Sequence, residues 1–225
     1  MNCREYLLTG TAKLSIDLCE NTADLLCRYY RELDKWGRKI NLVAKASEPD
    51  ILESHFLDSL TLLPLLPESD MARLLDIGSG AGFPGLPLKI ARPQLHVTLV
   101  EPRLKRVSFL KHVIRTLGLR HIEVIPNRLA PNDSQFSDRH GTFDFITCRA
   151  FTSIRDFLDI ARPFSAPTGE IICMKGLKAS EELNEWQGEY AEESPFICTE
   201  QLSLTLPDSC KQRKLLVFRE KSFAP

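Results

Sequence analysis

The sequence lacks the long hydrophobic runs that membrane proteins require. No stretch approaches 18 apolar residues, so we expect no membrane-spanning helix. Residues 1–10 include Arg4 and Glu5 and contain no apolar segment, so we expect no signal peptide. Internal repeats and low-complexity stretches are also lacking. These absences exclude fibrous and membrane-embedded classes and predict a cytoplasmic protein.

Clustered metal ligands and paired cysteines are lacking too. The seven cysteines are an odd number, are scattered along the chain and include no Cys-x-x-Cys pattern. We therefore expect neither a disulfide framework nor a zinc site, which is typical of a reducing cytosol. The five histidines are dispersed as well, so we expect no catalytic metal. The cysteines are Cys3, Cys19, Cys27, Cys148, Cys173, Cys198 and Cys210.

What the sequence does contain is typical of a globular protein with separated charges. Hydrophobic residues make up 43% and charged residues 26% of 225 residues, enough to bury a sizeable core. The net charge is only −1, yet residues 28–45 hold six basic and two acidic residues. Residues 103–120 hold six basic residues and no acidic one, whereas 179–200 hold seven glutamates and no Lys or Arg. Such separation suits binding of a polyanion on one face, or each run is simply a solvated helix surface.

The order of apolar patterns predicts an α/β fold. Residues 15–66 have helical periodicity, which Pro64 and Pro67 interrupt. From residue 72 onward, β-rich runs alternate with helical patterns, which favours a parallel sheet covered on both faces. The last two β-rich runs have no helix between them and should pair antiparallel at one edge. We expect strands at 73–77, 96–101, 122–126, 143–148, 170–175, 196–204 and 214–219, and helices at 84–91, 104–117, 153–162 and 179–191.

This pattern divides the chain into two parts. We expect residues 1–70 to form an N-terminal helical extension packed on the core, and residues 71–225 to form the α/β domain. The sheet should be mostly parallel with one antiparallel edge strand.

A glycine-rich turn follows the first expected strand. Gly78, Gly80 and Gly82 come after Asp76 at alternate positions, and a helix begins near Pro84. Such a turn lets the backbone approach a ligand at the carboxyl end of the sheet. Phe83 stands where dinucleotide enzymes need a glycine, and no Gly-Lys-Ser/Thr follows as in a phosphate-binding loop. The Asp-x-Gly-x-Gly-x-Gly order is instead typical of methyltransferases.

A carboxylate stands at the end of the second expected strand, in Leu99-Val-Glu101. In this position Glu101 can accept hydrogen bonds from both hydroxyls of a ribose. The alternative is an ordinary tight turn followed by a solvent-facing glutamate. The combination of strand, glycines, helix and spaced acid favours a cofactor site.

At these residues the chain resembles the ribosomal RNA small subunit methyltransferase G family, also called glucose-inhibited division protein B. The resemblance covers nearly the whole chain. It implies a Rossmann-like class I methyltransferase that uses S-adenosyl-L-methionine to methylate N7 of a guanosine in small-subunit (16S) ribosomal RNA. The motifs are Leu33-x-x-Trp36 with Ile40-Asn-Leu42, His55-Phe-Leu-Asp58-Ser-Leu60, Asp76-Ile-Gly-Ser-Gly-Ala-Gly-Phe-Pro-Gly85, Lys105-Arg-Val-Ser-Phe-Leu110, Cys148-Arg-Ala150 and Met174-Lys-Gly176.

The resemblance implies cofactor contacts at Gly78, Phe83, Leu129-Ala130 and Arg149, to which the turn adds Gly80 and the second strand adds Glu101. The chain departs from the family pattern at two places. Arg128-Leu129-Ala130 replaces a segment that usually carries an acid, and Gly37 follows Trp36 where the family usually has asparagine. A backbone group could read the adenine in place of the missing acid.

The reaction that the family implies needs no general base, because N7 of guanine has a free lone pair. Positioning and electrostatics should therefore carry catalysis. Arg149 and Lys175 are the candidate catalytic residues, for anchoring the cofactor carboxylate, an RNA phosphate or guanine O6. His55 and Asp58, three residues apart on one helix, are interpreted as packing and hydrogen-bonding contacts of the N-terminal part with the core, or alternatively as RNA or active-site contacts.

Arg103, Lys105 and Arg106 open a helix, where cations oppose the helix dipole, and this favours contacts with RNA phosphates. We expect a monomer that acts on small-subunit ribosomal RNA or on an assembling small subunit. Three alternatives remain open. The same fold could methylate a protein or small molecule, the chain could be a non-catalytic nucleic-acid-binding module, or it could be a nicotinamide dehydrogenase, which Phe83 disfavours.

Overall fold

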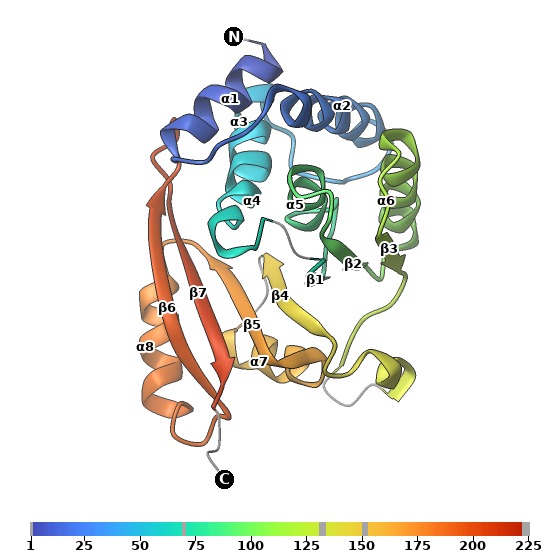
Figure 1. Ribbon diagram of the computed structural model, residues 1–225. Coiled ribbons are helices and arrows are strands. Elements are labelled where there is room, and N and C mark those ends of the chain that lie inside the picture. The colour runs from blue at the N-terminus through green and yellow to red at the C-terminus, as the bar shows by residue number, and fades with distance from the viewer. Residues whose placement is uncertain (1, 69–70, 131–133, 150–152, 222–225) are drawn as a thin grey trace.

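A seven-stranded sheet runs through the molecule in the order β3-β2-β1-β4-β5-β7-β6 (Figure 1). The computed structural model describes residues 2–68, 71–130, 134–149 and 153–221. Strands β3, β2, β1, β4 and β5 are parallel, and β7 runs antiparallel to both β5 and β6. The strands are β1 (Arg73–Ile77), β2 (His96–Val100), β3 (Ile122–Ile125), β4 (Phe143–Arg149), β5 (Ser165–Lys175), β6 (Phe196–Thr205) and β7 (Gln212–Glu220).

This sheet confirms the predicted fold class. Each expected strand is present, and the last two form an antiparallel hairpin at one edge, with Thr205 opposite Gln212. The hairpin arises because the chain after β6 has no helical segment that could carry it across the sheet to a parallel position. Crossover connections join β1 to β5 in turn, and these connections keep the five strands parallel.

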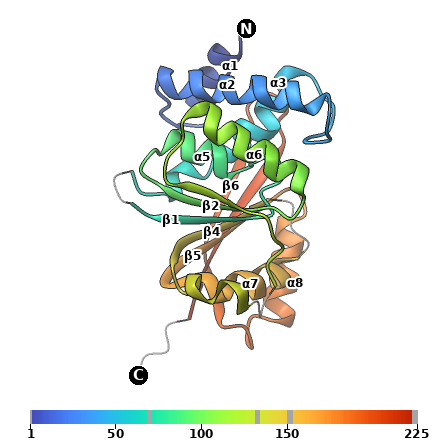
Figure 2. The same ribbon diagram turned by 90° about the vertical axis from the view of Figure 1, so that its right-hand side faces the viewer.

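Helices cover both faces of the sheet (Figure 2). Helices α1, α2, α5 and α6 lie on one face, and α7 and α8 lie on the other. Gly118 ends α6 in the left-handed conformation, with φ of +65°, which glycine adopts readily. The helices are α1 (Cys3–Lys13), α2 (Glu20–Gly37), α3 (Glu48–Ile51), α4 (Asp58–Leu60), α5 (Gly85–Ala91), α6 (Leu104–Leu117), α7 (Ile154–Ala161) and α8 (Ala179–Glu189), with a π-helical turn at Leu52–Leu57 and 3-10 turns at Leu63–Leu65, Ser134–Arg139 and Arg162–Phe164.

The N-terminal helices share a hydrophobic core with α5, α6 and one face of the sheet. Tyr29 and Phe56 are fully buried, and their rings contact that of Phe83 at centroid distances of 5.4 and 5.2 Å. A second core lies on the other face, between the sheet and helices α7 and α8. Of the predicted division at residues 70 and 71, residues 69–70 lie outside the described residues. The division into two parts therefore stays a prediction.

The N-terminal region differs from the sequence prediction in two ways. Helix α1 lies within the helical extension expected at 1–70 but precedes residues 15–66, whose periodicity indicated helix, because its own apolar residues form no continuous stripe. The expected helical region 15–66 is also interrupted: residues 38–47 connect α2 and α3 without regular helix. Packing against α2 and the π-helical turn stabilises α1, and local periodicity does not report such tertiary contacts.

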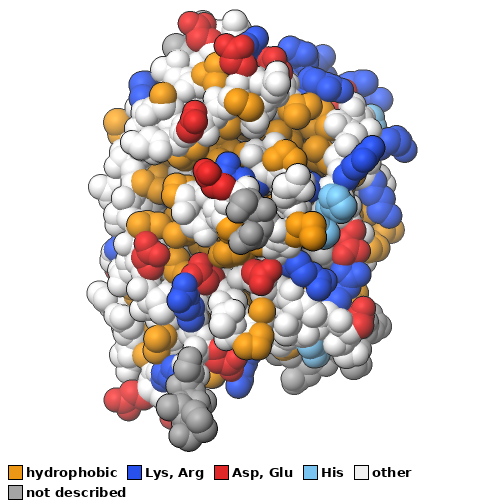
Figure 3. All heavy atoms as spheres, in the orientation of Figure 1, with side chains coloured by type: hydrophobic (Ala, Val, Ile, Leu, Met, Phe, Trp, Pro, Cys, Tyr) orange, Lys and Arg blue, Asp and Glu red, His pale blue; other side chains and the backbone are white. Residues whose placement is uncertain are grey.

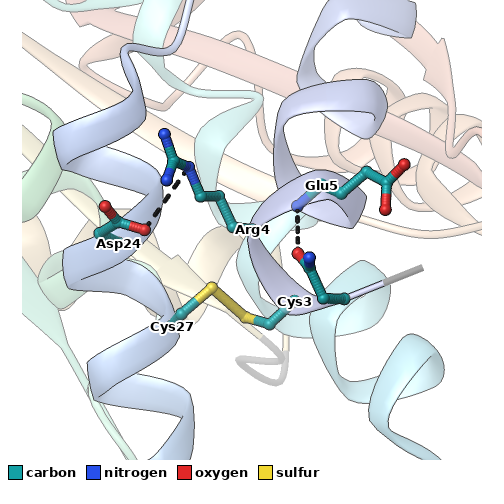
Figure 4. Close-up of a disulfide and its surroundings, with 6 residues drawn as sticks. Cys3, Arg4, Glu5, Asp24 and Cys27 are labelled. Atoms are coloured by element: carbon teal, nitrogen blue, oxygen red, sulfur yellow. Dashed lines mark hydrogen bonds and ion pairs between the residues drawn. A yellow bond between two sulfur atoms is a disulfide. The ribbon is translucent and has the colours of Figure 1, made fainter.

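One disulfide is present, although the cysteine count predicted none. Cys3 in α1 is bonded to Cys27 in α2, beside an ion pair between Arg4 and Asp24 (Figure 4). The pairing depends on how the two helices meet, which the spacing of cysteines along the chain cannot reveal. The other five cysteines are free thiols. Within the described ranges, no helix is both long enough and apolar enough to span a membrane.

Candidate active site

The glycine-rich turn lies between β1 and α5, at the carboxyl edge of the sheet. Gly78, Gly80 and Gly82 have φ values of +78°, +59° and +103°, so each occupies a region that side chains with a Cβ rarely adopt. The N–H groups of Gly78 and Ser79 donate to the Val100 carbonyl, which fixes the turn against β2. A Cβ on Gly78 would meet no atom within 4 Å. One side of the Gly78 backbone is therefore open to the approach of a ligand.

Asp76, the last-but-one residue of β1, is a fully buried carboxyl group with one oxygen unused. Its Oδ2 accepts a hydrogen bond of 3.0 Å from the Gly85 N–H, and its Oδ1 has no hydrogen-bond partner among the described residues. Burial raises the pKa of Asp76 from its ordinary value to about 7, against the lowering effect of the Gly85 hydrogen bond. A buried acceptor without a partner costs free energy unless a donor reaches it. Asp76 thus fits a ligand that brings a donor or a positive charge.

Glu101, directly after β2, is bound to the glycine turn. Its Oε2 accepts the Gly80 N–H at 2.9 Å, and its Oε1 accepts the Arg103 N–H at 2.8 Å. The carboxylate is only 3% exposed, and Arg106 Nη1 lies 3.8 Å from Oε2. Each carboxylate oxygen can accept a second hydrogen bond. Glu101 can therefore hold the turn and still accept hydrogen bonds from the two hydroxyls of a ribose.

We expect Glu101→Ala to weaken binding of S-adenosyl-L-methionine, the cofactor that the family resemblance implies, by about 1–3 kcal/mol, because two ribose hydroxyls would lose a charged acceptor and two backbone donors lose theirs. Titration calorimetry measures the effect. Glu123→Ala is a matched control, because it removes a carboxylate near the other end of the neighbouring strand, where Glu123 pairs with Arg139. An unchanged dissociation constant in Glu101→Ala would show that the carboxylate makes no contact with the ribose.

The remaining candidate residues follow the other parallel strands at the same edge. The chain passes from β1 to β2 and β3 on one side and returns to β4 and β5 on the other, so the strand order reverses beside β1. Ligands of open α/β sheets bind at this reversal. Leu129, which follows β3, is buried, Ala130 is exposed, and Arg149 and Lys175 end β4 and β5. Ala150 of the family motif lies outside the described residues.

Arg149 is held by the π-helical turn of the N-terminal region. It donates to the Ser54 carbonyl at 3.0 Å and to His55 Nδ1 at 2.6 Å, and its guanidinium lies 5.1 Å from the centre of the Phe83 ring. Burial lowers the pKa of Arg149, whereas Asp58, 3.8 Å away, raises it. The site therefore contains a fixed, partly desolvated cation next to the glycine turn.

His55 and Asp58 both contact Arg149, so hydrogen bonding and charge join packing where the N-terminal region meets β4. Burial, together with the charge of Arg149, lowers the pKa of His55 to about 3, and the ring is neutral at physiological pH. With Nδ1 accepting from Arg149, the ring proton is on Nε2. Burial raises the pKa of Asp58, which Arg213 opposes through a 2.9 Å contact. The sequence analysis missed Arg213, because nothing in its local sequence distinguishes it from other strand cations.

Phe83 is buried rather than open to a ligand. Its ring is 3% exposed and stacks on His55 and Tyr29. The Tyr29 hydroxyl donates to the Ala81 carbonyl, so α2 is bonded directly to the glycine turn. The ring of Phe83 therefore packs between the glycine turn and the N-terminal region.

The comparison with protein families decides what this arrangement is. A model of the family described as rRNA small subunit methyltransferase G matches residues 22–207. The chain belongs to this family. A relative named ribosomal RNA small subunit methyltransferase G from Desulfotalea psychrophila is 42% identical to this chain. The alignment covers 95% of this chain and 96% of the relative. Another relative of the same name, from Syntrophus aciditrophicus, is 39% identical, and the alignment covers 94% of this chain and 87% of the relative.

Solved structures of other methyltransferases share the fold. A predicted O-methyltransferase from Agrobacterium tumefaciens has a TM-score of 0.58 at 16% identity, covering 74% of this chain and 82% of its own. A SAM-dependent methyltransferase from Aquifex aeolicus has a TM-score of 0.55 at 19% identity, covering 76% and 93%. At such identities the likeness concerns architecture alone, and it confirms the Rossmann-like methyltransferase fold.

The remaining candidate cations of this chain differ in their exposure and in whether a carboxylate pairs with them. Lys175 is 8% exposed and forms a 2.6 Å ion pair with Glu182 of α8, which neutralises its charge. Arg103 and Lys105 are exposed, whereas Arg106 is half-buried beside Glu101. Among the described residues, no three His, Cys, Asp or Glu side chains gather in a way that could hold a metal ion.

Proposed function

We propose that this protein transfers the methyl group of S-adenosyl-L-methionine to N7 of a guanosine in small-subunit (16S) ribosomal RNA. The observation that carries the proposal is family membership over residues 22–207 together with an intact glycine turn, Asp76 and Glu101 at one edge of the sheet. The curated relatives carry the name of ribosomal RNA small subunit methyltransferase G.

The residues at the carboxyl edge fit S-adenosyl-L-methionine. The open space at Gly78 admits a ligand against the backbone, Glu101 has lone pairs for the ribose, and the unpartnered Oδ1 of Asp76 offers a buried acceptor for a donor group. Gly80, Phe83 through its backbone, Leu129 and Ala130 complete the proposed cofactor contacts. When bound, the cofactor supplies an electrophilic methyl group on a positively charged sulfur.

The chain's own residues act by positioning. Guanine N7 carries a free lone pair, so no residue has to remove a proton, and catalysis rests on orientation and electrostatics. Arg149 is fixed by Ser54, His55 and Asp58, so it can anchor an anionic group without being free to approach N7. The neutral His55 brings no charge to the site. Both features suit a reaction that makes guanine positive, because a mobile cation near N7 would oppose it.

Two basic segments lie side by side and supply a surface for RNA. Helices α2 and α6 are joined by a hydrogen bond from Arg28 to the Thr116 carbonyl and by a 2.6 Å contact between Glu32 and His112. We call the Lys and Arg side chains of residues 28–45 and 103–120 the α2–α6 basic face. All of them are exposed except Arg106. Lys and Arg gather at the upper right in Figure 3, where Figure 1 places the end of α2 and helix α6.

The glutamate-rich helix α8 lies on the opposite face of the sheet from α2 and α6 (Figure 2). This separation supports the interpretation of the basic segments as an RNA surface, because the glutamates of α8 do not lie on the face that carries the basic side chains. We further propose that the protein acts as a cytoplasmic monomer, on free small-subunit RNA or on an assembling small subunit.

Reversing the charges of Arg103, Lys105 and Arg106 to Glu should weaken RNA binding. Each lost phosphate contact should make the log–log salt dependence less steep by about 0.7 on single strands. S-adenosyl-L-methionine affinity should change little by comparison, although Arg106 lies near Glu101. Fluorescence anisotropy with a labelled small-subunit RNA fragment at several salt concentrations measures RNA affinity and its salt dependence.

The matched control reverses Glu185 and Glu189 of α8 and Glu193, which follows it, to Lys; all three are exposed and away from the start of α8. This variant changes the same amount of charge on the far face and should bind RNA much like the parent. If both triple variants bind like the parent, the basic face is only solvated surface, and RNA recognition lies elsewhere.

The proposed reaction itself is tested by mass mapping of small-subunit RNA from cells with and without the gene. A methylguanosine that disappears in the deletion strain and returns with the intact gene is the expected result. An unchanged modification map would contradict the proposed substrate.

A further inference from the structure

A cleft lies on the other side of the site from the α2–α6 basic face. It is formed by the turn between β5 and α8 and by the β6–β7 hairpin, and it has a cavity volume of about 350 Å³. In Figure 1 these elements lie on the left, α2 and α6 reach to the upper right, and the end of β4 lies between them. The cleft begins at Gly176, directly after the candidate residue Lys175, so it borders the site already described. It is lined by Gly176, Leu177, Ala179, Ser180, Ser203, Leu204, Thr205, Gln212, Arg213 and Lys214.

The lining of this cleft offers donors and positive charge without a carboxylate. Among the described residues that line it, Arg213 and Lys214 are the only charged ones, and hydroxyl groups come from three others. Arg213 is neutralised by Asp58. Lys214 donates to the Ser180 hydroxyl at 2.8 Å, and it has no carboxylate within ion-pair distance among the described residues. The cleft therefore holds one uncompensated cation.

The position of Lys214 makes that cation costly for the fold. Lys214 on β7 stands directly opposite Lys175 on β5, and like charges in such a cross-strand pair destabilise a sheet. Glu182 pairs with Lys175 alone, so it relieves only one of the two charges. A cation kept at a cost to stability, in a cleft lined by hydroxyls, fits an anion that brings the missing negative charge.

We propose that this cleft binds a phosphodiester group of the substrate RNA, on a nucleotide that flanks the methylated guanosine. The inference rests on the proposed function, since the substrate must be RNA. The strand then crosses the site between the cleft and the α2–α6 basic face. Leu177 at the rim is 81% exposed and offers an apolar contact to the ribose or base of that nucleotide.

The test compares Lys214→Gln with Lys221→Gln. Lys221 follows the same strand, β7, at its far end and contacts backbone carbonyls there, so the control removes an equal charge away from the cleft. Lys214→Gln should weaken binding of the labelled small-subunit RNA fragment about tenfold and make the salt dependence less steep by about 0.7. It should leave S-adenosyl-L-methionine affinity unchanged, and its melting temperature should equal or exceed that of the parent.

A second variant separates binding from stability. Ser203 stands opposite Lys214 in the β6–β7 register, so Ser203→Asp places a carboxylate beside the free cation. This variant should stabilise the hairpin and still weaken RNA binding, which a merely structural role of Lys214 would not produce.

The proposal is overturned if Lys214→Gln and Ser203→Asp bind RNA with the parent's affinity and salt dependence, or if Lys221→Gln is equally impaired. A failure of the proposed function has a different result, because the parent protein itself would then neither bind nor methylate the RNA. Parent activity together with unchanged cleft variants refutes the cleft alone.

Discussion

Gly78→Val should abolish measurable S-adenosyl-L-methionine binding, with a loss of at least about 100-fold in affinity, while the protein stays folded. Gly78 has a φ of +78°, and the space beyond its Cα is open. A valine there places two methyl groups in the space proposed for the cofactor and strains the backbone by about 1–2 kcal/mol. Calorimetry reports the affinity, and thermal unfolding reports the strain.

Gly118→Val is the matched control for that strain. Gly118 has a φ of +65°, ends α6, and also has space for a Cβ, which would meet no atom within 4 Å. The two variants should therefore lose comparable stability, yet Gly118→Val should bind the cofactor normally. Near-native affinity in Gly78→Val, or an equal loss in both variants, would contradict the placement of the cofactor against the glycine turn.

The affinity for S-adenosyl-L-methionine should rise with pH up to about 7 and then level off. The buried Asp76 has a pKa of about 7, and only its ionised form attracts the positively charged cofactor. Below that pH the Asp76 carboxyl group must lose its proton before the cofactor binds. The logarithm of the affinity should therefore increase by up to about one unit per pH unit. Calorimetry between about pH 5.5 and 7.5 should also detect proton release, as a binding enthalpy that depends on the buffer.

Asp76→Asn tests whether this titration belongs to Asp76. The amide has nearly the same shape, so it keeps the packing but carries no charge. We expect it to bind the cofactor about tenfold or more weakly at pH 7.5, with little dependence on pH. Titration of the ligand itself is common to both proteins and cancels. An equally steep pH dependence in the variant would assign the proton to another group.

The stability of the free protein should depend on pH in the opposite direction to its affinity for the cofactor. Because the folded-state pKa of Asp76 lies above its unfolded value, the folded protein binds more protons between about pH 4 and 7. The contribution of Asp76 to stability therefore falls as pH rises through that window in the free protein. Asp76→Asn should lack this fall, and bound cofactor should reduce it.

The sequence by itself determined the α/β domain and its glycine turn, because these depend on local patterns. Alternation of β-rich and helical segments places the strands within a few residues, and helix α6 has the predicted bounds 104–117. The carboxyl ends of parallel strands meet at one edge whatever the loops do. Asp76, Glu101 and Arg149 could therefore be assigned to one site from their positions in the chain.

Only the tertiary structure decided which partners these residues have. Arg149 is held by His55 of the π-helical turn and by Asp58 at the start of α4, about 90 residues earlier, and Arg213 reaches the Asp58 carboxylate from the last strand. The disulfide between α1 and α2, the ion pair that neutralises Lys175 and the burial of Phe83 are likewise long-range. Such contacts depend on how helices pack against the sheet, and a pattern along the chain reports which face of an element is apolar but not which element will cover it.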